Sequence, residues 1–113
     1  MKTKFEKIMK ITSELLSYCH HYGAKEFHFD ISEEKDAVAL SLQARPEDLS
    51  EKELDYLKTA LSAPRQREVE QDYWELIGES GNNSELTLIG MLCDDAEVIY
   101  ENRILTITLK RHD

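Results

Sequence analysis

The sequence predicts an α+β protein built as a two-layer sandwich, in which helices cover one face of a sheet of about four strands. Two pairs of short segments alternate apolar and polar side chains, which is typical of antiparallel hairpins with one solvent-facing side. The segments before and between these pairs repeat apolar residues at helical spacing. Together the patterns give the order αββαααββ within one domain, residues 1–113.

The first helix is expected over residues 3–22, because apolar side chains recur at helical spacing along one face. That face holds Phe5, Ile8, Met9, Thr12, Leu15, Leu16 and Cys19. Lysines lie on the other face. Gly23 follows as a helix stop, since glycine adopts the left-handed conformation without steric cost.

The first hairpin joins strands expected over residues 25–31 and 37–44, with a polar turn over residues 32–36. In the first strand the residues expected to point toward the core are Phe27, Phe29 and Ile31. His28 and Asp30 alternate with them and are expected on a polar, solvent-facing side of the sheet. In the second strand the core residues are Val38, Leu40 and Leu42.

Two polar-faced helices are expected between the hairpins, over residues 50–62 and 66–78. The first begins with a capping box, in which the Ser50 hydroxyl meets a backbone N–H and Glu53 reaches back. Its inward residues are Leu54, Leu57 and Leu61. The second helix presents Val69, Tyr73, Leu76 and Ile77 on one face.

The C-terminal part of the chain predicts a helix over residues 84–94 and two closing strands over 96–100 and 104–110. The helix is apolar on most sides, which indicates that it is buried. Gly90 within it is expected to allow close approach to another element. The last strand places Leu105, Ile107 and Leu109 in the core.

Composition limits the partners and the compartment. The 113 residues are 41% apolar and 33% charged, and the formal net charge is −9, which argues against nucleic acid because phosphate binding requires a basic face. No run of 18 apolar residues suggests a membrane span, and the N-terminal segment lacks the apolar core of a secretory signal. Only Cys19 and Cys93 occur, so a cytoplasmic protein with two unbridged thiols is expected.

Several clusters allow a chemical and a structural interpretation. Cys19, His20 and His21 are adjacent on a helix and point about 100° apart, so they are not expected to share a metal ion. Asp94 and Asp95 suit either acid/base chemistry or a turn before the next strand, and the turn is favoured.

The arginines and the aromatic pair of the middle segment also allow two interpretations each. Arg65 and Arg67 suit an anion or simple solvation. Tyr73 shares the apolar face of its helix, whereas Trp74 is offset, so Trp74 is either an interface anchor or a cover for the core edge.

A family resemblance is carried by the order of the C-terminal elements and by the first helix. A Gly/Asn turn leads into the apolar segment Leu86–Cys93, and the acidic pair Asp94-Asp95 and two strands follow. In the first helix, Glu14 precedes Gly23 by nine residues, as in the pattern E-x-x-x-N-A-x-x-H-G. These features resemble the GHKL ATP-binding fold, shared by gyrase, sensor histidine kinases and bacterial anti-sigma-factor kinases.

The chain departs from that family where the family binds nucleotide. Tyr18 stands where the family has the asparagine that holds magnesium. Residues 43–48 contain no glycine where the family has an adenine-contacting glycine box. The phosphate-wrapping box is reduced to one glycine between acids. The resemblance therefore implies a degenerate site, whose vestigial pocket residues are Glu14, Tyr18, Gly81, Asn82 and Asn83.

Two functions of different classes follow. The first is a non-catalytic regulatory or protein-interaction domain without cofactor or metal, which binds a protein partner or forms a homo-oligomer. Its expected binding residues are His28 and Asp30 on the sheet, and Tyr73 and Trp74. The alternative is an ATP-binding serine kinase or regulator of the anti-sigma-factor type, which uses magnesium and atypical motifs.

Overall fold

The computed structural model describes residues 3–69 and 84–112. The elements in chain order are α1 (Lys4–His21), β1 (Phe27–Glu33), β2 (Ala37–Ala44), α2 (Glu51–Leu61), the 3₁₀ turn η1 (Arg67–Val69), α4 (Ser84–Met91), β3 (Asp95–Glu101) and β4 (Ile104–His112). None of the helices in these ranges combines the length and apolarity that crossing a membrane requires.

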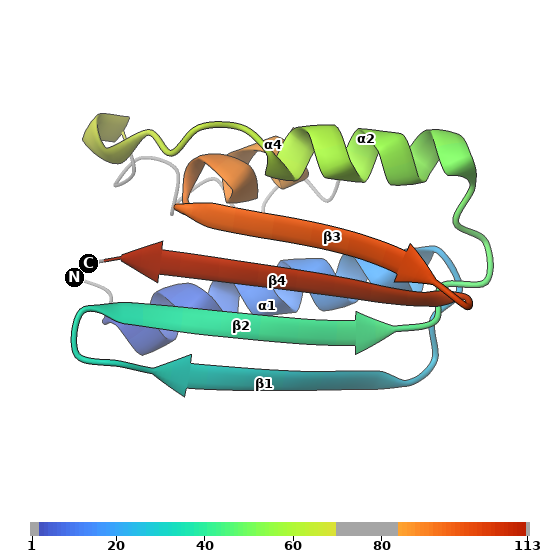
Figure 1. Cartoon of the computed structure of the whole chain (residues 1–113), viewed down its shortest axis with the longest axis horizontal. Helices are drawn as coiled ribbons and strands as arrows, with labels where there is room; N and C mark the ends of the chain where they lie inside the picture. The colour runs from blue at the N-terminus through green and yellow to red at the C-terminus, as the bar shows by residue number, and fades with distance from the viewer. Residues whose placement is uncertain (1–2, 70–83, 113) are drawn as a thin grey trace.

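The strands form one antiparallel sheet in the order β1-β2-β4-β3. The two sequential hairpins thus lie side by side, joined through β2 and β4 at the centre. Figure 1 shows α1 running behind the strands, with α2 and α4 on the side of β3. Helices cover one face, and the predicted α+β class and two-layer arrangement are confirmed.

The core lies between the sheet and the helices. The central strands supply Val38, Leu40, Leu42 and Ala44 from β2, and Leu105, Ile107 and Leu109 from β4. The helices contribute Ile8, Ile11, Leu15, Leu57, Leu61, Leu86 and Ile89 to the core. The predicted inward residues of β2 and β4 are confirmed, because alternation along a strand assigns every second side chain to the covered face.

The first helix begins at a capping box that Thr3 and Glu6 form with each other. Its buried stripe follows Ile8, Ile11, Leu15, Tyr18 and Cys19. Phe5 and Met9 belong to the predicted apolar face, but their side chains are 50% and 37% exposed. They lie on the flank of the helix, and the core covers only the central stripe.

The strand β1 begins two residues later than predicted and extends through Glu33, which shortens the turn. Phe27 and Ile31 are half-buried, but Phe29 is 45% exposed, so its predicted place in the core is wrong. The reason is tertiary. α1 packs on β2, and α2 packs on α4 and β3, which leaves β1 at the edge with the least cover.

The second helix begins at Ser50, whose hydroxyl accepts the backbone N–H of Glu53. This is the serine half of the predicted capping box. Leu57 and Leu61 are buried as predicted, while Leu54 is half-buried.

The predicted close approach at Gly90 is confirmed. A Cβ atom there would lie 2.4 Å from the carbonyl oxygen of Ala60 and 3.1 Å from the Cα of Leu61. Glycine therefore lets α4 rest directly on the backbone at the end of α2. α4 itself ends at Met91, three residues earlier than predicted.

The helix predicted over residues 66–78 falls mostly outside the described residues. Its first part is the 3₁₀ turn η1. Tyr73, Trp74, Gly81, Asn82 and Asn83 all lie outside the described ranges.

Candidate functional site

Two of the residues that the GHKL resemblance marks as a vestigial pocket, Glu14 and Tyr18, lie in the described part of the chain, and both are on α1. Glu14 is half-buried, and the side chain of Tyr18 is buried where α1 faces α2. The Tyr18 ring lies 5.0 Å from that of Tyr22 at an interplanar angle of 56°. Its hydroxyl has no hydrogen-bond partner, and neither has the buried Oε2 of Glu53 on α2.

The electrostatic surroundings of Tyr18 keep its phenol neutral. Burial raises the pKa of Tyr18 well above its usual value of 10.0, and the nearby Tyr22 and Glu53 raise it further. A neutral, buried phenol beside a carboxylate is a poor substitute for an asparagine that binds magnesium, as in the GHKL family that the sequence resembles. The side chain belongs to the hydrophobic core of the protein.

Replacing Tyr18 by phenylalanine is expected to leave stability within about 0.5 kcal/mol of the parent or to raise it, because the buried hydroxyl makes no hydrogen bond. Urea denaturation of the two proteins measures the difference. A loss above about 1 kcal/mol would show that the hydroxyl is hydrogen-bonded in solution.

The segment that follows β2 runs from Arg45 to Ser50 before α2 begins. It folds back on the end of α1, where the backbone N–H of Asp48 donates to the carbonyl of Tyr22 at 2.8 Å. Gly23 has a φ of +97°, and a Cβ there would lie 2.9 Å from a carboxylate oxygen of Asp48. Glycine is required at this turn, and the loop brings an acid to it.

The Cys-His-His run is dispersed, as the helical spacing predicts. Cys19 is buried, whereas His20 and His21 are exposed. Burial raises the pKa of the Cys19 thiol to about 12, so the thiol is neutral and unreactive. Cys93 is buried as well, and neither cysteine forms a disulfide.

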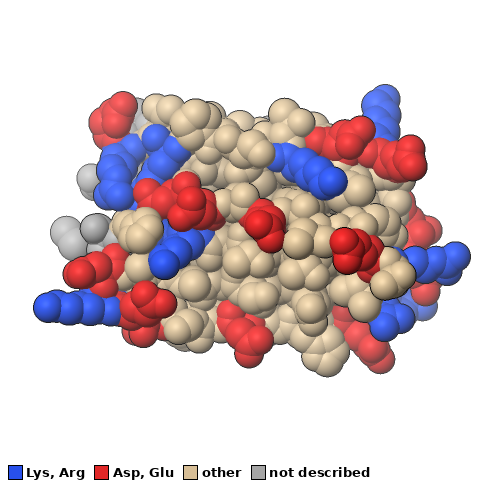
Figure 2. Space-filling model, viewed as in Figure 1, with Lys and Arg blue, Asp and Glu red and all other residues tan. Residues whose placement is uncertain are grey.

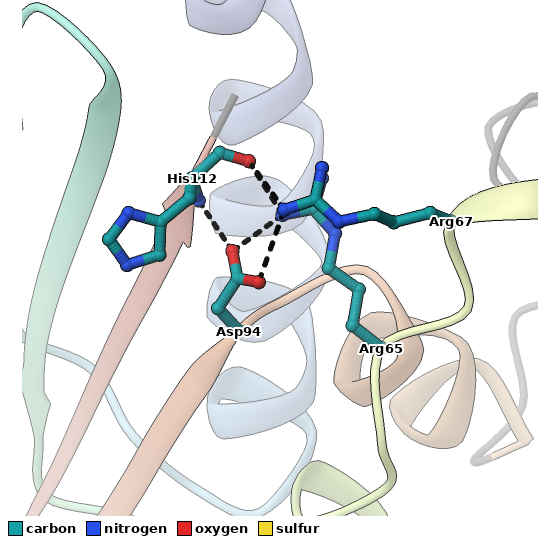
Figure 3. Close-up of polar contacts among 4 residues, drawn as sticks. All are labelled: Arg65, Arg67, Asp94 and His112. Carbon is teal, nitrogen blue, oxygen red and sulfur yellow. Dashed lines mark hydrogen bonds and ion pairs between the residues drawn. The ribbon is translucent and has the colours of Figure 1, made fainter.

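Asp94 links three segments at one end of the sheet (Figure 3). One of its carboxylate oxygens accepts the backbone N–H of His112 and the guanidinium of Arg65, both at 2.5 Å. Arg65 also donates to the carbonyl of His112 at 2.6 Å. Arg67 adds longer contacts of 3.4 Å to Asp94 and to the same carbonyl. The carboxylate thus ties the chain after α2 to the ends of α4 and β4.

The charge state of Asp94 follows from these contacts. Partial burial raises its pKa, but the N–H of His112 and the positive charges of Arg65 and Arg67 outweigh burial and hold the pKa below the usual 3.8. A carboxylate held ionised by fixed donors is a poor proton carrier near neutral pH. The favoured turn interpretation of Asp94 fits this geometry, and Arg65 and Arg67 are partnered by the carboxylate.

Among the residues that the structure describes, no helix covers the sheet face turned away from α1 (Figure 1). His28 and Asp30 project from it, as the alternation of β1 predicts, and both are exposed. The register aligns Asp30, Ser41, Thr108 and Glu97 in one row across the sheet. Figure 2 shows this face as mostly uncharged surface with scattered charged side chains of both signs.

Strand alternation does not show that β1 lies at the edge of the sheet. The exposed large apolar side chains among the described residues include Phe5, Met9 and Phe29. Their exposure depends on which helix covers which strand, and no local pattern encodes that.

Comparison with known proteins adds no relative. No protein-family model matches the chain, and no curated protein is significantly similar to it. The GHKL resemblance remains a prediction from the residues given above.

Proposed function

We propose that this chain is a non-catalytic regulatory domain of the cytoplasm that acts by binding protein, with a degenerate GHKL-like fold that lacks a working nucleotide site. Its binding surface is the open sheet face and the β1 edge, where His28 and Asp30 lie. The observation that carries the proposal is this uncovered face.

An open antiparallel face suits protein binding because a partner can pack against several strands at once. The central strands β2 and β4 contribute Ala39, Ser41, Thr106 and Thr108 to this face, between Asp30 on β1 and Glu97 on β3. Side chains of this size let a partner approach closely, and the separate charges fix its register. The formal net charge of −9 favours a partner with a basic surface or one that pairs with individual acids.

The geometry near α1 supports the absence of a working nucleotide site. The loop after β2 brings Asp48 to the turn at Gly23, where an acid would repel a phosphate. The Tyr18 side chain is buried in the hydrophobic core and offers magnesium no charged oxygen. These features weigh against the alternative, an ATP-binding kinase or regulator of the anti-sigma-factor type.

Titration of ¹⁵N-labelled protein with Mg-ATP and Mg-ADP tests the proposal. We expect no saturable amide shifts over residues 14–22, 43–48 and 78–86 at nucleotide concentrations up to the millimolar range. Magnesium chloride alone serves as the control for ionic effects. Saturable shifts in these segments would overturn the proposal and favour the kinase alternative.

A further inference from the structure

The outer edge of β1 carries backbone groups directed away from the sheet. The N–H of Glu34 donates to the carbonyl of Ala37 at 2.8 Å, which makes this a hydrogen-bonded pair of the β1–β2 ladder. Inward and outward pairs alternate along an antiparallel strand. The residues whose N–H and C=O groups point outward are therefore Phe27, Phe29, Ile31 and Glu33. Among the described residues no strand pairs with them.

We propose that β1 pairs antiparallel with β1 of a second copy of this chain, in the register that places Phe29 opposite Phe29 of the second copy. The two sheets would join into one continuous sheet across a twofold axis. The inference rests on the proposed interaction function and names its partner. Main-chain hydrogen bonds supply the affinity, and the side chains of the strand select the register.

Complementary polar side chains select this register. His28 lies opposite Asp30 of the second copy, and the symmetry repeats the contact. Two residues before β1, Lys25 lies opposite Glu33 of the second copy, again twice. Each strand therefore meets opposite charges or hydrogen-bonding partners at both positions, and such cross-strand pairs are favourable.

Neighbouring registers are disfavoured by the same side chains. A shift of the pairing by two in one direction places Asp30 opposite Asp30 of the second copy. A shift in the other direction places Glu26 opposite Asp30. A shift of one residue turns the apolar side of one strand toward the polar side of the other and mismatches the outward backbone groups.

The apolar side of β1 fits the same pairing. Phe29, which is 45% exposed, would meet its own copy, and the half-buried Phe27 would meet Ile31. These side chains lie on the covered side of the sheet, where the monomer gives them least shelter. Pairing would remove them from water, which is the main apolar contribution to association.

The flank of α1 extends this apolar surface. Tyr18 faces Glu53 and Tyr56 of α2, and helical geometry places Phe5 and Met9 on the opposite flank, toward β1. The N-terminal end of the helix is held there, because the Lys4 ammonium donates to the carbonyl of Glu34 at 2.7 Å.

The other sheet edge lacks this complementarity. β3 carries Asp95, Glu97 and Glu101 and no base. Antiparallel pairing of β3 with itself around its middle sets acids opposite acids, a device that keeps edges apart. Ile99 on β3 is 40% exposed, lies on the open side of the sheet, and provides an apolar control at the other edge.

Sedimentation of the full chain over a concentration series up to about 1 mM tests the association. We expect a reversible monomer–dimer equilibrium, and slowed hydrogen exchange of the Phe27, Phe29 and Ile31 amides in the dimer. Phe29→Asp should abolish the dimer, while Ile99→Asp should leave it unchanged. A protein that stays monomeric over the whole range would overturn the inference.

A charge exchange tests the register. His28→Glu places an acid opposite Asp30 and should weaken the dimer roughly tenfold or more. The double variant His28→Glu with Asp30→Lys places opposite charges at both symmetry-related contacts and should restore affinity to within roughly threefold. A dimer that ignores His28→Glu, or one that the double variant fails to restore, would contradict this pairing.

The two proposals fail by different readouts. If the protein is monomeric and binds no nucleotide, the self-pairing is wrong, but a protein-interaction domain with another partner still stands. Saturable Mg-ATP binding removes the proposed function whatever the state of association.

Discussion

Replacement of Gly90 by alanine is expected to destabilise the protein by about 2 kcal/mol, in spite of the higher helix propensity of alanine. The new methyl group would lie 2.4 Å from the carbonyl oxygen of Ala60, and that atom belongs to the backbone of α2 rather than to a side chain that can rotate away. α4 must therefore move off α2, and buried contacts of Leu86 and Ile89 loosen with it. Guanidinium denaturation monitored by circular dichroism measures the loss.

Two further variants calibrate that result. Gly90→Val should cost more than Gly90→Ala, because a larger group requires a larger separation. Thr59→Ala, next to Ala60 but exposed, should change stability by no more than about 0.5 kcal/mol. Unchanged or increased stability of Gly90→Ala would contradict the direct contact of the two helices.

Asp94→Asn is expected to lower stability by about 1–3 kcal/mol at neutral pH. The substitution removes the charge that Arg65 meets, and the Arg65 side chain is only 8% exposed. It also weakens the acceptor of the His112 N–H. Asp95→Asn is the matched control, since this exposed neighbour should tolerate the change within about 0.5 kcal/mol.

The stability that Asp94 contributes should depend on pH in one direction. Because the folded pKa of Asp94 lies below the usual 3.8, the contribution is complete well above that value and is lost as pH falls through the folded pKa. Melting temperatures of the parent and of Asp94→Asn should therefore converge on acidification below about pH 4. A constant difference down to pH 2 would contradict an ionised Asp94 in the folded protein.

Sequence patterns predicted the central strands best. β2 was expected over residues 37–44 and occupies those residues, because its alternation and the Pro46 that follows leave little choice. β4 runs to His112 rather than to residue 110, since β2 offers it partners up to Ala37. The end of a strand depends on its neighbour, which the strand's own residues do not specify.

The sequence predicted the surroundings of the candidate site residues less completely than the strands. His28 and Asp30 were assigned to an exposed sheet face from alternation alone, and they lie there. The contacts of Asp94 with Arg65 and His112 could not be predicted, because these residues are distant in the sequence. They come together only once the strands have paired. Tyr18 was expected in a vestigial pocket, and the structure places its side chain in the hydrophobic core.

By itself the sequence determined the class of the fold, the alternation of β2 and β4, and the need for glycine at Gly90, since each follows from spacing along a short segment or from one residue without a side chain. Only the tertiary structure decided which strand lies at the edge and what shelters it. Phe29 has the same local pattern as the buried Leu42 with which it pairs. One is exposed and the other buried because α1 packs on β2, and the placement of a helix over a sheet is the joint outcome of all contacts in the core.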